Sequence, residues 1–453
     1  NSPNTIIGGD NASPGGSCSG ACNLVSGNLV NGVGLWYQST TNTVVSGNYI
    51  GVNVNGAAAL ANGDIGLEIN ETANNTAGGT TAAKRNVISG NLGAGIFITG
   101  GSAYSNNVLG NYIGTGANGS TRIANHKMGL GIGYSPGIQP AHDNTIGSKA
   151  SKTPGICDGG CNVISGNTSN GILMSSTHGN RISANHIGIS WNNSQYVSNT
   201  SDGIGMLDSP NNIIGGTALE GNIINGNTDN GIILVGGSST GNRLTSNLIF
   251  GNAGAGVMIA AGVDNAILEN QIAANGKLGI DIGYNNISHN DAGDGDDGPN
   301  RYQNFPDIYS VKNTNGSYIS GTLNSRPNTS YRIDFYQSDG CNAGKPNNYG
   351  EGQVHLGNLI TTTDQYGNKV FTFTSPQALA GNKYITSTAT KMVGSIPAET
   401  SEFSLCRLVN TTRPAVTNGA NWFLKDDLTS GNADKAFGYG FPSYLLMCAW
   451  DAN

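Results

Sequence analysis

Four aspartates, Asp291, Asp294, Asp296 and Asp297, stand close together in one glycine-rich loop. Closely spaced carboxylates in a flexible loop supply the oxygen ligands that a hard cation such as calcium prefers. The terminal glutamate of an EF-hand is missing from this loop. The loop therefore predicts a calcium site, with a solvated acidic turn as the alternative, and no other cofactor is indicated.

Acids and bases that could act on a glycan are spread along the chain. A glycoside hydrolase needs two or three carboxylates facing one groove, and a lyase acting on uronates needs a base beside a charge that neutralises the substrate carboxylate. Asp202 and Asp208 stand close together in one segment. The longest insertion, residues 115–160, carries the other candidates, which are His126, Lys127, His142 and Asp143.

A third set of residues could bind sugars without reacting with them. Tyr49, Tyr112 and His186 each follow an asparagine in a recurring segment and precede an isoleucine. If the isoleucines point inward, these three side chains should point outward, and aromatic faces along a rigid rod can stack on sugars. The simpler interpretation is a corner residue that covers the neighbouring segment.

The elements that position these residues are short strands of an internal repeat. NLVSGN ending at Asn28 recurs as NVISGN or NIINGN ending at Asn91, Asn167 and Asn227, and a second series with GNYIG follows by 18 or 20 residues. Apolar residues alternate within each segment, with Gly or Asn at the corners, as in β-strands. We expect roughly 20 residues per coil, about three coils per block and about 13 or 14 coils, with the corner asparagines stacked in a ladder.

This repeat argues against a catalytic cluster. Glu68 and Asp281 share their repeat position with glycines, so no column of acids is expected. Asp64 matches Asp202, but we place the two about three coils apart, or roughly 14 Å at one strand spacing per coil. We therefore assign no catalytic residue.

Composition limits the class of protein and its partners. Seventy glycines and only 11% charged residues favour tight turns over long amphipathic helices. The net charge of −7 offers no basic stripe for nucleic acid, and no run of about 18 apolar residues could span a membrane. A neutral or glycan-like partner is more plausible.

The cysteines indicate an oxidising compartment. Two CxxxC loops, 18–22 and 157–161, each precede a repeat strand, and no HxxxH pair accompanies them. Local disulfides fit this pattern better than zinc sites, and they imply an extracellular or cell-surface protein. Cys341 and Cys406 could form a third bridge, which would leave Cys448 unpaired.

The NVISGN and GNYIG repeats resemble those of the pectate-lyase-like right-handed parallel β-helix superfamily, in particular its bacterial secreted and surface members. The resemblance covers about residues 1 to 300. It implies, together with the general rule for parallel crossovers, a right-handed coil. We therefore predict an all-β chain with a parallel β-helix over residues 1–308.

The remaining sequence changes character. Residues 309–409 contain alternating strands between turn clusters, which predicts a β-sandwich. With GEG at 350–352 and SEFSLC at 401–406, they resemble the immunoglobulin-like modules that follow such β-helices, in which the cysteines matching Cys341 and Cys406 pair. Residues 410–453 resemble a single FG-GAP or VCBS-type surface repeat.

Three functions are compatible with these features. We favour a non-enzymatic structural or adhesive protein of the cell surface, such as a filament or sheath subunit, with other copies of itself or polysaccharide as partners and with glycans on its sequons. The second is a polysaccharide lyase or glycoside hydrolase with its site in the 115–160 insertion or near Asp202 and Asp208. The third is a carbohydrate-binding module that uses Tyr49, Tyr112 and His186.

Overall fold

The computed structural model describes residues 2–133, 139–149, 155–313, 316–341 and 348–409, and beyond them only the backbone of three short strands. Among the described residues, no helix has the length and apolarity needed to cross a bilayer. The only helices there are two short 3-10 segments, η1 (Ala82–Lys84) and η2 (Pro299–Tyr302).

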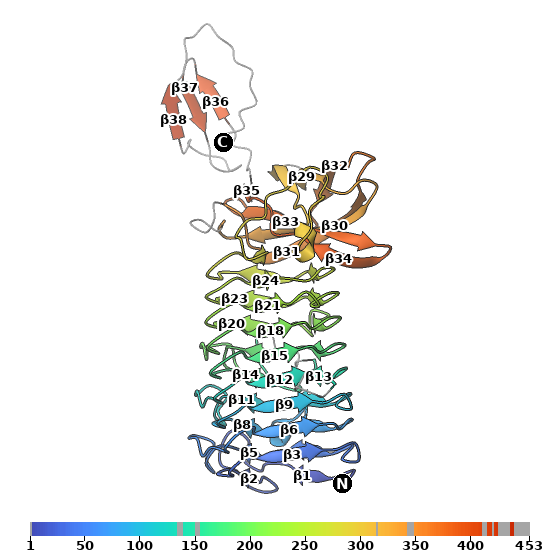
Figure 1. Ribbon diagram of the computed structural model, residues 1–453. Helices are drawn as coiled ribbons and strands as arrows, with labels where there is room; N and C mark the ends of the chain where they lie inside the picture. The colour runs from blue at the N-terminus through green and yellow to red at the C-terminus, as the bar shows by residue number, and fades with distance from the viewer. Residues whose placement is uncertain are drawn as a thin grey trace.

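The first 27 strands form three nine-stranded parallel sheets, so that this part of the chain is a right-handed parallel β-helix (Figure 1). The first sheet contains β1 (Ile6–Gly8), β4 (Val44–Ser46), β7 (Thr76–Gly78), β10 (Asn107–Leu109), β13 (Thr145–Ile146), β16 (Arg181–Ile182), β19 (Ile213–Gly215), β22 (Arg243–Thr245) and β25 (Ala266–Leu268).

The second sheet contains β2 (Leu24–Val25), β5 (Tyr49–Ile50), β8 (Val87–Ile88), β11 (Tyr112–Ile113), β14 (Val163–Ile164), β17 (His186–Ile187), β20 (Ile223–Asn225), β23 (Leu248–Phe250) and β26 (Gln271–Ala273). The third sheet contains β3 (Val33–Trp36), β6 (Leu67–Asn70), β9 (Ile96–Thr99), β12 (Leu130–Gly133), β15 (Ile172–Ser175), β18 (Ile204–Leu207), β21 (Ile232–Val235), β24 (Val257–Ile259) and β27 (Ile280–Ile282).

Each coil contributes one strand to each sheet, and alternate apolar side chains fill one continuous core along the axis. Consecutive coils pair in register, as where Leu130 lies between Ile96 and Ile172. The nine coils span about 40 Å at one strand spacing per step. Isoleucine dominates this core because a β-branched side chain packs well on a pleated surface.

Three columns of buried asparagines hold the coils together, as the repeat predicted. In the second column, the Asn185 backbone N–H and side-chain amide both donate to Asn222 Oδ1, each at 3.0 Å, and the amide also donates to the Ile146 carbonyl. Buried amide groups are thereby paired at every step. The first column runs through Asn75, Asn106, Asn144, Asn180, Asn212, Asn242, Asn265 and Asn300, and the third through Asn62, Asn91, Asn125, Asn167, Asn199, Asn227, Asn252 and Asn275.

The number of coils corrects the sequence prediction. Successive asparagines of the third column lie 23 to 42 residues apart, so each block contains two coils and not three. The SGN motif misled the count because it occurs at two different corners of the coil.

Glycine stands directly before the ladder asparagine at these corners because the turn needs a positive φ. The φ angle is 70° at Gly47 and 76° at Gly90, and glycine adopts it without strain.

Two antiparallel sheets follow the β-helix and pack on each other through a second apolar core. One contains β28 (Asp307–Asn313), β29 (Ser317–Asn324) and β32 (Asn368–Thr374). The other contains β30 (Ser330–Ser338), β31 (Val354–Thr362), β33 (Tyr384–Val393), β34 (Ile396–Thr400) and β35 (Arg407–Leu408). We call these sheets the sandwich, and its likeness to immunoglobulin modules stays a prediction.

Residues 410–453, for which we predict a surface repeat, lie outside the described residues except for the backbone of a three-stranded sheet, and so does Cys448. The strands of that sheet are β36 (Ala415–Asn418), β37 (Asn421–Leu424) and β38 (Lys435–Gly438). The three predicted disulfides all form, joining Cys18 to Cys22, Cys157 to Cys161 and Cys341 to Cys406.

The sandwich closes the last coil of the β-helix. Its Glu351 takes the place of the next asparagine in the third column and accepts hydrogen bonds from the backbone N–H of Ala274, at 2.7 Å, and of Asn275, at 3.0 Å. Tyr336 and Phe403 of the sandwich belong to the apolar core of the β-helix. The sandwich therefore satisfies the polar groups of the open end and covers its apolar core.

A buried carboxyl group makes this junction sensitive to pH. Glu402 is 1% exposed and accepts hydrogen bonds from the backbone N–H of Ile282, at 2.8 Å, and of Ser288, at 3.0 Å. Burial raises the pKa of Glu402 to about 8, and the neighbouring Asp281 adds to this, although the two N–H donors oppose it. Burial also raises the pKa of Asp281 to about 6.

We predict that stability declines as the pH rises from about 4.5 to about 8. A carboxyl whose pKa is raised on folding stabilises the protein fully below its unfolded pKa, and this contribution is lost as the pH rises through the folded pKa. In thermal melts over this range, Glu402→Gln should flatten the slope of Tm against pH, whereas Asp10→Asn, at an exposed position, should keep the wild-type slope. A Glu402→Gln slope equal to that of the wild type would contradict the prediction.

Candidate functional site

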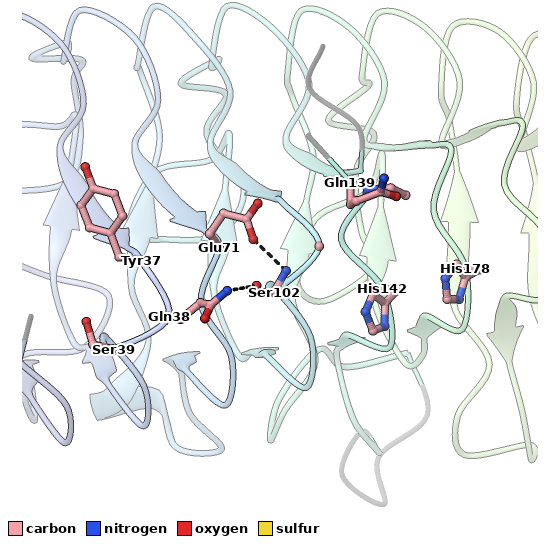
Figure 2. Close-up of a pocket in the computed structure, with 10 residues that line it drawn as sticks. Tyr37, Gln38, Ser39, Glu71, Ser102, Gln139, His142 and His178 are labelled. Carbon is pink, nitrogen blue, oxygen red and sulfur yellow. Dashed lines mark hydrogen bonds between the residues drawn. The ribbon is translucent and has the colours of Figure 1, made fainter. Parts of the chain in front are cut away.

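A groove of about 930 Å³ runs along the turns that connect the third sheet to the first (Figure 2). The turns after β3, β6, β9, β12 and β15 supply its walls. The lining is rich in groups that form hydrogen bonds and is made of Tyr37, Gln38, Ser39, Glu71, Gly101, Ser102, Gln139, Pro140, His142 and His178. Because one turn comes from each coil, the groove follows the rod axis.

Three rings form a column at the edge of this groove. The Tyr104 and His142 rings stack at 5.6 Å with 14° between their planes, and the His142 and His178 rings stack at 5.0 Å with 11°. Each ring stands two residues before an asparagine of the first column. Since the ladder fixes the height of each coil, it also fixes the spacing of the rings.

A carboxylate orients the middle ring. Asp143 Oδ2 lies 2.7 Å from His142 Nδ1. Asp143 has a positive φ of 51° at the corner, and its backbone N–H donates to the His178 carbonyl at 3.1 Å. A Cβ atom on Gly179 would lie 1.9 Å from Asp143 Oδ1, so a glycine in the next coil leaves room for this carboxylate.

Glu71 anchors the other end of the groove. Its Oε2 accepts a hydrogen bond of 2.8 Å from the Ser102 backbone N–H, and Ser102 Oγ accepts another of 2.8 Å from Gln38 Nε2 (Figure 2). These bonds connect turns of three different coils. The Glu71 carboxylate is therefore held in place within the groove.

The chemistry available here is acid–base chemistry. A histidine whose Nδ1 is bonded to a carboxylate is held in one orientation, with the other ring nitrogen available to exchange a proton. The sequence named His142 and Asp143 as candidates, and the structure brings them together. His178 and Glu71 were missed, although the ring-x-Asn pattern at Tyr104, His142 and His178 could have revealed the column.

The other acid–base candidates lie outside the groove. His126 and Lys127 belong to the corner after the second sheet, where Lys127 pairs with Asp64 at 3.6 Å. Asp202 is buried and accepts hydrogen bonds from the backbone and side chain of Asn230, at 3.1 and 2.9 Å. Asp202 therefore has a structural role.

Coil counting also changes the distances on which the sequence argument relied. Asp64 precedes β6 and Asp202 precedes β18, and these strands are four coils apart in the third sheet and not three. Asp208 follows β18 in the row of turns next to His178, where its Oδ1 accepts a hydrogen bond of 3.2 Å from the Ser238 backbone N–H. None of these carboxylates lines the groove.

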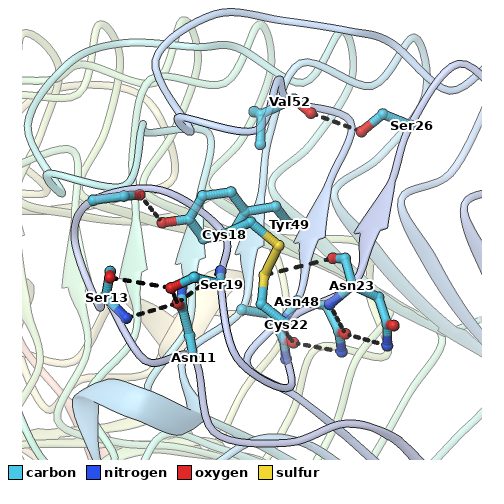
Figure 3. The surroundings of a disulfide bond; sticks show 12 residues. Asn11, Ser13, Cys18, Ser19, Cys22, Asn23, Ser26, Asn48, Tyr49 and Val52 are labelled. Carbon is cyan, nitrogen blue, oxygen red and sulfur yellow. Dashed lines mark hydrogen bonds between the residues drawn. A yellow bond between two sulfur atoms is a disulfide. The ribbon is translucent and has the colours of Figure 1, made fainter.

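The predicted aromatic stripe is not exposed. Tyr49, Tyr112 and His186 do point away from the core, but they are only 1, 4 and 3% exposed. Side loops cover them, as Figure 3 shows for the Cys18–Cys22 disulfide beside Tyr49. Burial lowers the pKa of His186 to about 4, and its Nδ1 lies 2.9 Å from the Ser190 carbonyl. No free ring face remains for a sugar, which corrects the expected exposure.

The acidic loop brings three of its four aspartates together. Carboxylate oxygens of Asp291, Asp294 and Asp296 lie within 4.8 Å of one another, and Asp297 does not belong to this cluster. Burial raises the pKa of Asp294 and of Asp296, and for Asp296 the charges of Asp291 and Asp294 add to the effect. A bound cation would relieve this repulsion, so calcium binding stays a prediction.

No protein-family model and no curated protein matches the sequence. Solved structures are similar to it at low identity. The A-module of a mannuronan C-5 epimerase from Azotobacter vinelandii is 14% identical, with 54% of this chain and 59% of that chain covered and a TM-score of 0.37. The enzymatically active domain of tailspike protein 2 from bacteriophage CBA120 is 10% identical, with 86% and 73% covered and a TM-score of 0.27.

A periplasmic alginate epimerase is 13% identical, with 59% of this chain and 66% of that chain covered and a TM-score of 0.26. The chain thus spans about three fifths of the length of the mannuronan epimerase module. Scores this low carry no argument about activity. The assignment of the fold rests on the three parallel sheets and their register.

We predict that calcium raises Tm through the aspartate cluster, by about 1 °C for each kcal/mol of binding free energy in a chain of 453 residues. Asp296→Asn should reduce this shift because it removes one charged ligand, and Asp297→Asn, outside the cluster and exposed, should keep it. Melts of the chelator-treated chain with and without calcium provide the measurement. Equal Tm values in the two conditions would contradict a calcium site.

Proposed function

We propose that the chain is a polysaccharide lyase whose base is His142 in the groove beside the first column. The observation that carries the proposal is the contact of 2.7 Å between His142 Nδ1 and Asp143 Oδ2 at the groove wall. An imidazole held in this way can take a proton from a bound substrate. The structural-protein interpretation depended on the lack of any such cluster, so the lyase alternative is now preferred.

The groove suits a sugar polymer. Its amides and hydroxyls, such as those of Gln38, Ser39 and Gln139, are groups that hydrogen-bond sugar hydroxyls. Its direction along the rod lets neighbouring sugar units meet turns of successive coils, about 4.8 Å apart. The disulfides support secretion into an oxidising compartment, outside the cell or in a periplasm.

Elimination assigns roles to the two adjacent histidines of the groove. His142 would remove the proton on the carbon next to a uronate carboxylate, the bond from the adjacent ring carbon to the glycosidic oxygen would break, and a carbon–carbon double bond would form. The departing oxygen would take up the proton that His142 has removed, which balances the step. Tyr37 lies in the turn after β3, three coils or about 14 Å from His142, and cannot reach the same bond. His178, stacked on His142, would donate a hydrogen bond to the uronate carboxylate.

Hydrolysis is the less favoured reaction in this groove. A hydrolase requires a pair of carboxylates facing one bond. Glu71 and Asp143 come from turns two coils apart, and Asp143 is engaged by His142. Polymerisation into a filament, adhesion and glycosylation of the sequons stay predictions.

We predict that His142→Ala lowers kcat on a uronate-containing polysaccharide by about 100-fold, because the base is removed. The measurement is the ultraviolet absorbance of the unsaturated product, over a panel of polyuronates and neutral glycans. His126→Ala removes a histidine outside the groove and should retain wild-type activity.

Two results would reject the proposal. One is a His142→Ala variant that is folded and fully active. The other is a wild-type chain that binds a glycan of the panel but yields no unsaturated product from any of them, in which case the groove would be a carbohydrate-binding site.

A further inference from the structure

The groove wall contains a second chemical possibility beside acid–base catalysis. His142, Asp143 and His178 each offer one ligand atom, and these atoms lie within 4.8 Å of one another. Two imidazoles and one carboxylate form a ligand set that zinc and other first-row divalent ions use, whereas calcium prefers oxygen ligands alone. This cluster is thus chemically distinct from the acidic loop.

The backbone holds the two histidines at a fixed separation. His142 and His178 pair as a parallel bridge between adjacent coils. Two residues after them, the Asn144 backbone N–H donates to Asn180 Oδ1 at 3.0 Å, and both asparagines are buried. The two rings lie nearly parallel, with 11° between their planes and 5.0 Å between their centroids. Two ligands are therefore positioned before any ion binds.

The third ligand can adjust. The Asp143 side chain is 57% exposed and that of His142 is 28% exposed, so small rotations meet little resistance from packing. The contact of 2.7 Å between Asp143 Oδ2 and His142 Nδ1 brings two potential ligand atoms together. Gly179 leaves space for the Asp143 carboxylate on the side of His178. Zinc needs ligand distances of about 2.0 to 2.2 Å, so binding requires such rotations.

We propose that His142, Asp143 and His178 bind a divalent transition-metal ion of the zinc type. With three protein ligands, such an ion keeps a further coordination position for water or a ligand oxygen. If the proposed lyase function holds, ion and proton compete for His142, so the bound metal inhibits elimination. The site then regulates the enzyme by the concentration of the metal.

Titration of the full-length chain with zinc chloride in a calorimeter tests the binding. The wild type should show saturable binding, which His178→Ala weakens at least 10-fold. His126→Ala, which removes an exposed histidine outside the cluster, should bind zinc as the wild type does. Thermal melts of each variant without metal establish that it is folded. Absence of saturable binding, or binding of equal strength to His178→Ala, would overturn the site.

Activity measurements separate this proposal from the proposed function. Zinc chloride should inhibit product formation by the wild type, a chelator should restore it, and zinc should not change the residual rate of His178→Ala. A chain that binds zinc through His178 but processes no polyuronate would retain the metal site and reject the lyase. Two results would overturn the inhibitory role. In one, zinc binds through His178 and leaves the rate of product formation unchanged. In the other, product formation requires zinc.

Discussion

The structure depends on one constraint, which is that each coil must lie in register on the coil before it. Short strands of two to four residues leave many corner groups inside the stack, and buried amide groups are costly unless they are paired. The asparagine columns pair them with the next coil, by contacts such as Asn111 Nδ2 to Asn162 Oδ1 at 3.1 Å. Any residue placed at a fixed offset from a column asparagine then repeats at one strand spacing along the rod.

The candidate site is a direct product of this constraint. Tyr104, His142 and His178 occupy the same offset in three successive coils, and the ladder converts that offset into a stack of rings. The same constraint explains the cap, because the last coil needs partners that no further coil provides. Glu351 supplies a carboxylate where an asparagine would stand, and Phe403 covers the core.

Sequence alone predicted the β-helix and the ladder, because glycine and asparagine at corners leave a strong local pattern. The CxxxC spacing predicted two disulfides, and the resemblance to immunoglobulin-like modules implied the third. The sequence did not predict the number of coils, since SGN serves two corners. It also missed the burial of Tyr49 and Tyr112, because loops from other coils cover them, and nothing local marks that contact. His142 and His178 were hard to connect because 36 residues separate their ladder asparagines, in coils of uneven length.

The most direct test of this account is a disulfide cross-link between coils. In the double variant His142→Cys/His178→Cys, adjacent strands place the two Cα atoms about 4.8 Å apart, within the range of about 4.4 to 6.8 Å that a disulfide spans. The account predicts that peptide mapping after mild oxidation finds residues 142 and 178 joined, and that Tyr104→Cys/His178→Cys, two coils apart, stays reduced at these positions. Free thiols at 142 and 178 after oxidation would contradict the register on which the site depends.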